Sequence, residues 1–199
     1  MPKSPIDYEK LKELILTCPD KECQAAMAIQ YVLACRLGEL FPKDFDKYHS
    51  DGLLVDSFQN YPSYWQVSVA NFKQRKKKLV MKNGFILKEG ENWLSDICLN
   101  WRKEAIDKGR RELFTVSPEG MRKRIKKSLA GAGYDVKAQK TVSSHNLRDS
   151  RADHLLKLFG FNILDVQKTL GHANLKTTSE YIDSSVDERV KKLKEATKK

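Results

Sequence analysis

The sequence predicts an α+β fold that is mainly helical, with a small antiparallel sheet near the N-terminal third. Two observations favour this fold. Apolar residues recur at helical spacing over most of the chain, between residues that cap or break helices. Short runs rich in β-branched and aromatic residues are confined to a segment after the second predicted helix. The 199 residues, 40% of them hydrophobic and 32% charged, suffice for one globular domain with a core of its own.

The N-terminal third is predicted to hold two helices followed by the strands. The first helix spans residues 7–17 and ends at Cys18-Pro19, because proline cannot continue a helix. Asp20 can cap the second helix, whose apolar residues continue to Leu33. After a turn at Phe41-Pro42 we expect strands at residues 52–55, 64–69 and 79–81, with a basic turn before the last and Asn83-Gly84 closing the sheet.

The rest of the chain is predicted to be helical. A helix over residues 91–108 carries one apolar stripe. Ser117-Pro118-Glu119 is typical of a helix start, with serine as the cap and proline in the first turn. We expect the later helices at residues 119–130, 146–159, 163–170 and 177–182, followed by a lysine-rich helix or tail at 184–199.

The charge balance indicates a polyanionic partner. Lysine and arginine exceed aspartate and glutamate by 37 − 26 = +11, and the pI is near 9.4. Such a balance favours DNA, RNA or an anionic membrane face, although a lysine-rich solvated surface would give the same number. No apolar run approaches the roughly 20 residues of a membrane helix, and the N-terminus lacks the apolar core of a signal peptide. We therefore expect a soluble, cytoplasmic protein with no membrane partner.

The four cysteines do not form a metal-binding or disulfide pattern. Cys18 and Cys23 are close in sequence, but no cysteine or histidine follows them at metal-ligand spacing. Four cysteines are also too few for a disulfide scaffold of this length. We expect them to be reduced and mostly buried, and we expect no metal site.

Four short motifs carry residues suited to phosphate chemistry. They are CRLGEL around Arg36, HNLR at residues 145–148, Gly171-His172, and Tyr181 nine residues after His172. Each alone has an ordinary structural interpretation, such as a surface ion pair, a helix C-cap or a core tyrosine. Their order, Arg…His-x-x-Arg…Gly-His…Tyr, resembles the tyrosine recombinase family, which includes phage integrases and Xer-like proteins. The resemblance covers residues 4–183, and VQKTLGHANLKTTSEYI is its most specific part.

The resemblance implies a fold and an activity. Residues 1–199 would form a tyrosine recombinase catalytic domain, without the N-terminal core-binding domain that family members usually carry. The activity would be site-specific recombination or integration, in which DNA is broken and rejoined through a covalent 3′-phosphotyrosyl intermediate with no metal, nucleotide or other cofactor. The implied partners are double-stranded DNA and further copies of the chain, as a dimer or tetramer on DNA sites.

The residue types fit the roles that the resemblance implies. Arg36 and Arg148 would hold the non-bridging phosphate oxygens, since guanidinium is always charged and donates in a fork geometry. Their charge would stabilise the transition state. Tyr181 would attack the phosphorus and store the bond energy covalently. His145 and His172 would donate hydrogen bonds to the phosphate, and one of them would help to accept the tyrosine proton.

A lysine in the basic turn would protonate the leaving 5′-oxygen. The family pattern places Lys73 best, with Lys76 as the second choice; phosphate gripping alone is the alternative for either. Glu39 would orient a basic residue, or form only a surface ion pair, because it follows Arg36 by three residues. The remaining residues expected to grip DNA phosphates are Arg75, Lys76, Lys77, Lys78, Arg122, Lys123, Arg124, Lys126 and Lys127.

Two rival functions use the same residues differently. A type IB topoisomerase-like enzyme shares the chemistry but rejoins the same strand. A catalytically silent relative would bind DNA only. The glycine-histidine pair and its nine-residue step to Tyr181 favour the recombinase.

Overall fold

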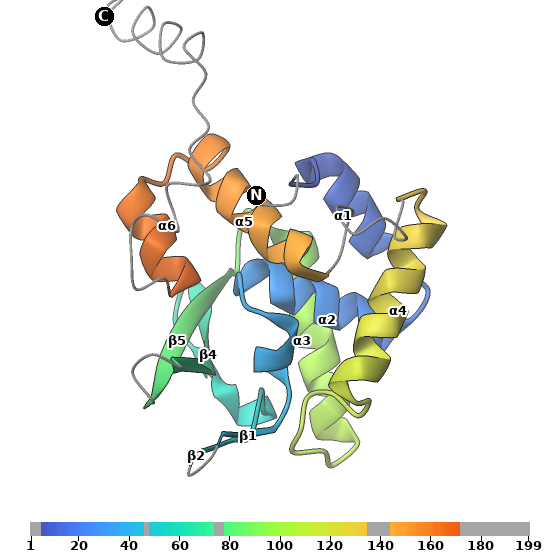
Figure 1. The fold of residues 1–199 in the computed structure, drawn as a ribbon, viewed down its shortest axis with the longest axis vertical. Coiled ribbons are helices and arrows are strands. Elements are labelled where there is room, and N and C mark those ends of the chain that lie inside the picture. Colours follow the sequence, from blue (N-terminus) through green and yellow to red (C-terminus); the bar gives the residue numbers. More distant parts are fainter. Residues whose placement is uncertain (1–4, 46–47, 74–77, 135–143, 172–199) are drawn as a thin grey trace, which may run out of the picture.

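The computed structural model describes residues 5–45, 48–73, 78–134 and 144–171 (Figure 1). Within these ranges the chain forms six α-helices and two small antiparallel sheets, which confirms the predicted, mainly helical α+β fold class. No helix in the described part is both long and apolar enough to span a membrane. The helices are α1 (Tyr8–Leu16), α2 (Lys21–Val32), α3 (Asn92–Asp107), α4 (Pro118–Gly131), α5 (Ser144–Lys157) and α6 (Ile163–Leu170), with short 3₁₀ turns η1 (Leu37–Leu40) and η2 (Val55–Ser57).

The strands form two separate antiparallel units. β1 (Lys43–Phe45) pairs with β2 (Tyr48–Ser50). β3 (Phe58–Asn60), β4 (Tyr64–Lys73) and β5 (Lys78–Leu87) form a three-stranded sheet in that order. β4 and β5 pair along their whole length, from Tyr64 opposite Leu87 to Lys73 opposite Lys78. This long hairpin lies at one side of the helices, next to α6 (Figure 1).

Helix α2 forms the centre of the core. All of its residues except Lys21 are buried, because α3, α4 and α5 pack around it (Figure 1). The helix begins as predicted, since the Asp20 carboxylate accepts a hydrogen bond from the backbone N–H of Cys23 at 3.0 Å. Its central position makes α2 the common support of these helices.

Local signals predicted several helix boundaries correctly. Ser117 caps α4 by accepting from the N–H of Gly120, and α6 has the predicted bounds. α6 ends at Gly171, which adopts a left-handed conformation with φ of 67°. The predicted helix at 177–182 and the basic segment at 184–199 lie outside the described residues.

Two strand predictions are wrong. Residues 52–55 form no strand: Leu54 makes a single bridge to Glu112, and the chain then enters η2. Asn83-Gly84 does not close the sheet, because β5 continues through it to Leu87. Gly84 serves instead as a packing position, since a Cβ there would lie 2.3 Å from Leu33 Cδ2. A glycine that looked like a turn signal therefore allows a strand to approach a helix end.

Candidate active site

Arg36 lies on a turn that connects the central helix to η1. Its side chain is 54% exposed, whereas the Glu39 side chain is 9% exposed. The Glu39 carboxylate accepts hydrogen bonds from the backbone N–H and from Nη1 of Arg36, both at 3.2 Å. Glu39 thus contacts both the main chain and the side chain of Arg36, as expected for a residue that orients a basic side chain.

Arg148, more than a hundred positions later in the sequence, lies beside the turn that bears Arg36. It lies one turn after His145 on α5, and it is buried whereas His145 is exposed. Its Nη1 donates to the carbonyl of Ala34 at 2.5 Å, two residues before Arg36. Its Nη2 donates to the carbonyl of Leu170 at 2.8 Å, directly before the C-cap Gly171. The structure therefore brings together three of the predicted motifs, those of Arg36, Arg148 and Gly171.

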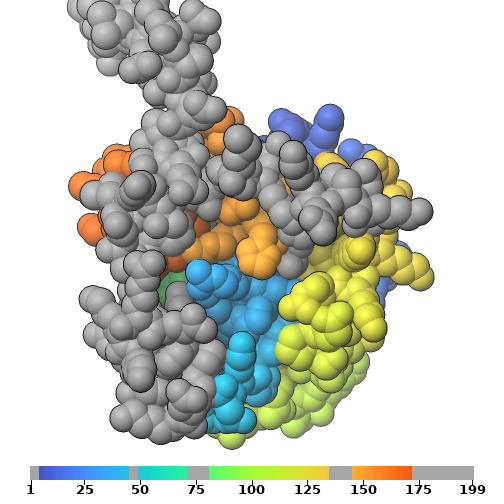
Figure 2. All heavy atoms as spheres, in the orientation of Figure 1, coloured from blue at the N-terminus to red at the C-terminus, as the bar shows by residue number. Residues whose placement is uncertain are grey.

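The space-filling view shows the same neighbourhood from outside (Figure 2). Atoms of α5, in orange, lie directly against atoms of the blue segment that follows α2, and the yellow α4 lies beside them.

The predicted nucleophile Tyr181 and the predicted hydrogen-bond donor His172 lie outside the described residues. Their roles stay predictions.

The hairpin places Lys73 at its tip. Lys73 is the last residue of β4, and its backbone pairs with that of Lys78, the first residue of β5. Lys76, Arg75 and Lys77 lie in the four residues between them, outside the described ranges. The choice between Lys73 and Lys76 as proton donor therefore stays open.

Sequence reasoning missed Lys82 on β5. This lysine is buried, and its ammonium donates to the carbonyl of Ala34 at 2.5 Å, as Arg148 does. Burial lowers its pKa from 10.5 to about 8. The strand alternation could have found it, because Lys82 has the same parity as the buried Ile86; ending the predicted strand at residue 81 hid that signal.

The rest of α5 also buries polar side chains, which sequence reasoning did not single out. Arg151 forms a two-pronged ion pair with Glu91 at 2.8 and 2.9 Å, and its guanidinium lies 4.9 Å from the ring centre of Tyr31. His154 contacts the Tyr31 hydroxyl at 2.8 Å and the Ile6 carbonyl at 2.9 Å. Burial lowers the pKa of His154, which favours the neutral ring. These contacts fix α5, and hence Arg148, against α2 and the N-terminal segment.

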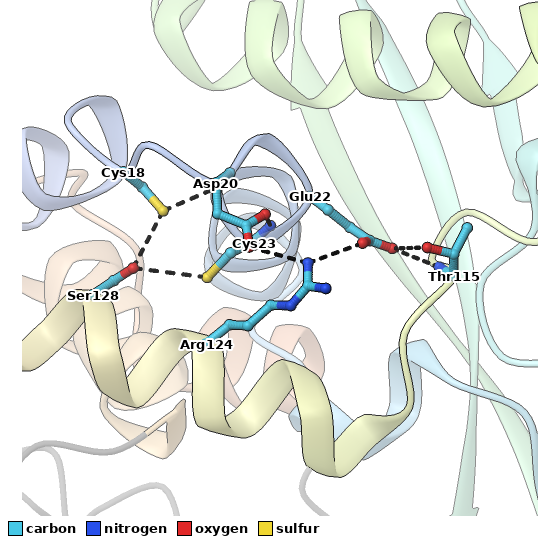
Figure 3. Close-up of polar contacts among 7 residues, drawn as sticks. All are labelled: Cys18, Asp20, Glu22, Cys23, Thr115, Arg124 and Ser128. Carbon is cyan, nitrogen blue, oxygen red and sulfur yellow. Dashed lines mark hydrogen bonds and ion pairs between the residues drawn. The ribbon is translucent and has the colours of Figure 1, made fainter.

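The basic residues of α4 divide into paired and exposed ones. Arg124 is held by Asp20 at 3.0 Å and by Glu22 at 3.2 Å, as Figure 3 shows. Glu22 in turn accepts from the backbone and hydroxyl of Thr115, so that Arg124 joins α4 to the start of α2 (Figure 3). Arg122 pairs with Glu119, while Lys123, Lys126 and Lys127 are exposed. The contribution of this helix to DNA binding stays a prediction.

All four cysteines are buried free thiols, as expected. Cys18 and Cys23 both contact the Ser128 hydroxyl, at 3.3 and 3.9 Å, where α4 packs on α2 (Figure 3). Complete burial raises the pKa of Cys35 to about 12, so the residue next to Arg36 stays a neutral thiol. These cysteines have a packing role.

With this geometry in view, the comparisons with known proteins decide the family. The sequence profile of the phage integrase family matches residues 6–188. The chain belongs to this family. It is 34% identical over 111 residues to "Tyrosine recombinase XerC 2" of Ralstonia nicotianae, covering 53% of this chain and 30% of that protein. It is 30% identical over 160 residues to "Tyrosine recombinase XerC" of Alcanivorax borkumensis, covering 79% of this chain and 46% of that protein.

Solved structures of tyrosine recombinases share the fold. The XerA recombinase superposes with a TM-score of 0.69 at 19% identity, covering 98% of this chain and 66% of that one. XerH bound to its difH substrate gives 0.68 at 18% identity, covering 98% and 54%. The catalytic domain of bacteriophage HP1 integrase gives 0.57 at 19% identity, covering 95% and 94%. This phage integrase family chain thus has the fold of tyrosine recombinase catalytic domains, and it spans less than half the length of those two XerC relatives.

Proposed function

We propose that this chain breaks and rejoins DNA strands as the catalytic domain of a site-specific recombinase, through a 3′-phosphotyrosyl bond to Tyr181. The observation that carries the proposal is the contact between Arg148 and the Ala34 carbonyl, which sets the predicted second arginine against the turn that bears Arg36. The family match over residues 6–188 includes all the residues that take part in the proposed chemistry.

The chemistry follows from the charges. Arg36 and Arg148 would neutralise the phosphodiester as charge grows on its non-bridging oxygens. The Tyr181 oxygen would form a bond to phosphorus while the bond to the 5′-oxygen breaks. His145 or His172 would help to take the tyrosine proton, and Lys73, or Lys76 as the second choice, would give the 5′-oxygen a proton. A 5′-hydroxyl of a partner strand would then attack the phosphotyrosine and release Tyr181. The number of phosphoester bonds is unchanged, so the reaction needs no external energy source.

The partners follow from the same chemistry. Exchange between two sites requires two duplexes and at least two active sites, so we expect copies of the chain to associate on DNA. XerH and its substrate DNA have been solved together, and this chain has the same fold. The net charge of +11 supports a DNA partner.

A trapping experiment tests the proposal. The wild-type chain is incubated with a pool of nicked duplexes of randomised sequence, in which the released 3′-flank diffuses away, and adducts that survive denaturing electrophoresis are sequenced. We expect a covalent adduct with the wild type and none with Tyr181→Phe, which keeps the ring and loses only the attacking oxygen. An adduct with Tyr181→Phe would contradict the assignment of the nucleophile.

The same material separates the rival functions. A topoisomerase-like enzyme would relax a supercoiled plasmid without exchanging strands between two recovered sites. A silent relative would bind the duplexes and form no adduct. Strand exchange between two sites, detected as a joined product, supports the recombinase.

A further inference from the structure

Lys82 is an unusual residue for the inward face of a sheet. It is 5% exposed and lies opposite Val69, which is fully buried. Lysine is almost never buried unless it has a partner, because transfer of the ammonium out of water is costly. Its partner here is the carbonyl of Ala34, 2.5 Å from Nζ.

The close approach of β5 to the end of α2 makes this contact possible. A Cβ on Gly84 would lie 2.3 Å from Leu33 Cδ2 and 3.1 Å from Leu33 Cα. A side chain at this position would collide with the fully buried Leu33, so glycine lets the strand lie close to the residue directly before Ala34. Lys82, one inward position away on the same strand, then reaches the turn itself.

The turn that receives Lys82 has an unfavourable backbone conformation. Ala34 has φ of 45°, and among the described non-glycine residues it alone has a positive φ. Residues with a Cβ rarely adopt this region, so neighbouring contacts must hold it. Two positive groups donate to its carbonyl, Lys82 from β5 and Arg148 from α5. The strand, the helix and the turn before Arg36 therefore meet at one oxygen atom.

We infer that Lys82 is a positioning residue for DNA cleavage, which holds the Ala34 turn so that Arg36 and Arg148 keep their relative placement. The inference rests on the proposed function. The ammonium gives a short charge-assisted hydrogen bond that a neutral side chain cannot replace. The Lys82 ammonium stays charged at neutral pH, because its pKa is lowered only to about 8. The guanidiniums of Arg36 and Arg148 act to lower this pKa, whereas the Glu39 carboxylate and the Cys35 thiol act to raise it.

This role gives opposite dependences of activity and stability on pH. The pKa of Lys82 is lowered to about 8 in the folded chain, whereas an unfolded lysine keeps its ordinary value of 10.5. Between these values the unfolded chain binds more protons, so folding stability rises with pH. In the same window Lys82 loses its charge, and the cleavage rate should fall. A residue with a merely structural role would not make the two quantities diverge.

The test measures adduct formation on a duplex recovered with the wild type, from about pH 6.5 to about pH 9.5, together with thermal unfolding. We expect Lys82→Met to cleave at least about tenfold more slowly than wild type near pH 7, since misplacement of a catalytic group costs up to about a hundredfold. Its DNA affinity should be unchanged, and it should unfold at the same or a higher temperature, because a buried charge is gone and Arg148 still satisfies Ala34. The alkaline fall in rate should be missing from its profile.

Two further variants complete the experiment. Lys88→Met is the matched control, since Lys88 is exposed just after β5 and its ammonium lies 5.9 Å from the ring centre of Trp65; it should retain the wild-type rate and profile. Lys82→Arg stays charged throughout, so it should keep most of the rate and lose the alkaline fall. If Lys82→Met does not fold, an unchanged alkaline fall in Lys82→Arg overturns the inference.

The failures of the two proposals are distinguishable. A wild-type chain that forms no adduct overturns the proposed function. A wild-type adduct together with an equal rate and an equal pH profile in Lys82→Met overturns only the role of Lys82.

Discussion

Helices α4 and α5 are both 14 residues long, but they bury different kinds of side chain. α4 buries Met121, Ile125 and Leu129 in a regular stripe and leaves its basic residues exposed, apart from Arg124, which pairs with residues at the start of α2. α5 buries five polar side chains: Asn146, Arg148, Ser150, Arg151 and His154 are all at most 7% exposed. The amphipathic helix follows the usual rule for a surface helix, and the other one violates it.

The difference shows that α5 buries polar groups, which are costly to bury, where the position of a side chain must be fixed. A buried polar group is tolerated only when it is hydrogen-bonded. On α5, partners on other elements are present for Arg148, Ser150, Arg151 and His154. Those partners fix the rotation of α5 about its axis and its position along that axis, and therefore the position of Arg148. The phosphate gripping proposed for the exposed lysines of α4 needs no such precision, since it would depend mainly on charge.

The largest expected effect is on the buried ion pair of α5. Arg151→Met leaves the Glu91 carboxylate buried without its partner and should lower the free energy of unfolding by about 3–5 kcal/mol, measured by urea denaturation. On α4, Arg122→Met removes an ion pair whose side chains are 55% and 60% exposed, and it should cost less than about 1 kcal/mol.

A double variant gives the internal control. Arg151→Met with Glu91→Leu removes both charges and should recover most of the loss, because a buried pair can be replaced by apolar groups at little cost. Equal losses for Arg151→Met and Arg122→Met would contradict the contrast between the two helices.

A smaller effect concerns acid. The pKa of His154 is lowered in the folded chain mainly by burial, so the unfolded chain binds the proton more strongly, and stability should be lost as pH falls below about 6.5. His154→Phe should be less stable near neutral pH and should show a flatter acid dependence in the same denaturation experiment. α4 contains no histidine and should add nothing to this slope.

His49 provides the opposite sign as a control. Asp44 and Asp51 raise its pKa, so its contribution is present at low pH and is lost as pH rises through the raised pKa. His49→Ala should therefore make the acid loss steeper. A flatter acid dependence in His49→Ala than in wild type would refute this assignment of signs.

The smallest effect on stability is expected at the exposed face of α4. Lys126→Ala with Lys127→Ala should change the free energy of unfolding by less than about 0.5 kcal/mol. The log–log dependence of DNA binding on salt should nevertheless become shallower by about 0.9 for each phosphate that is no longer neutralised. Lys157→Ala, at the end of α5, should leave the slope unchanged, since Lys157 already pairs with Asp153 at 2.8 Å. Equal slopes for the α4 double variant and wild type would remove this helix from the DNA-binding face.

Sequence alone determined the helices and the motif residues that are read locally. Asp20, Ser117 and Gly171 act as the caps that their residue types indicate, and the spacing of Arg36 and Glu39 predicted their ion pair. These signals are reliable because a cap, a turn or an i,i+3 contact involves residues a few positions apart. The family resemblance rests on motif order, which is also a property of the sequence.

Tertiary structure decided which polar residues face inward and which motifs meet. Nothing near Lys82 in the sequence indicates that its ammonium ends on the Ala34 carbonyl, or that Gly84 continues a strand rather than ending it. The burial of Arg151 likewise depends on Glu91, sixty positions away. Hydrophobic periodicity reports only which face of an element is apolar, whereas the burial of a charge depends on partners that come together when the chain folds.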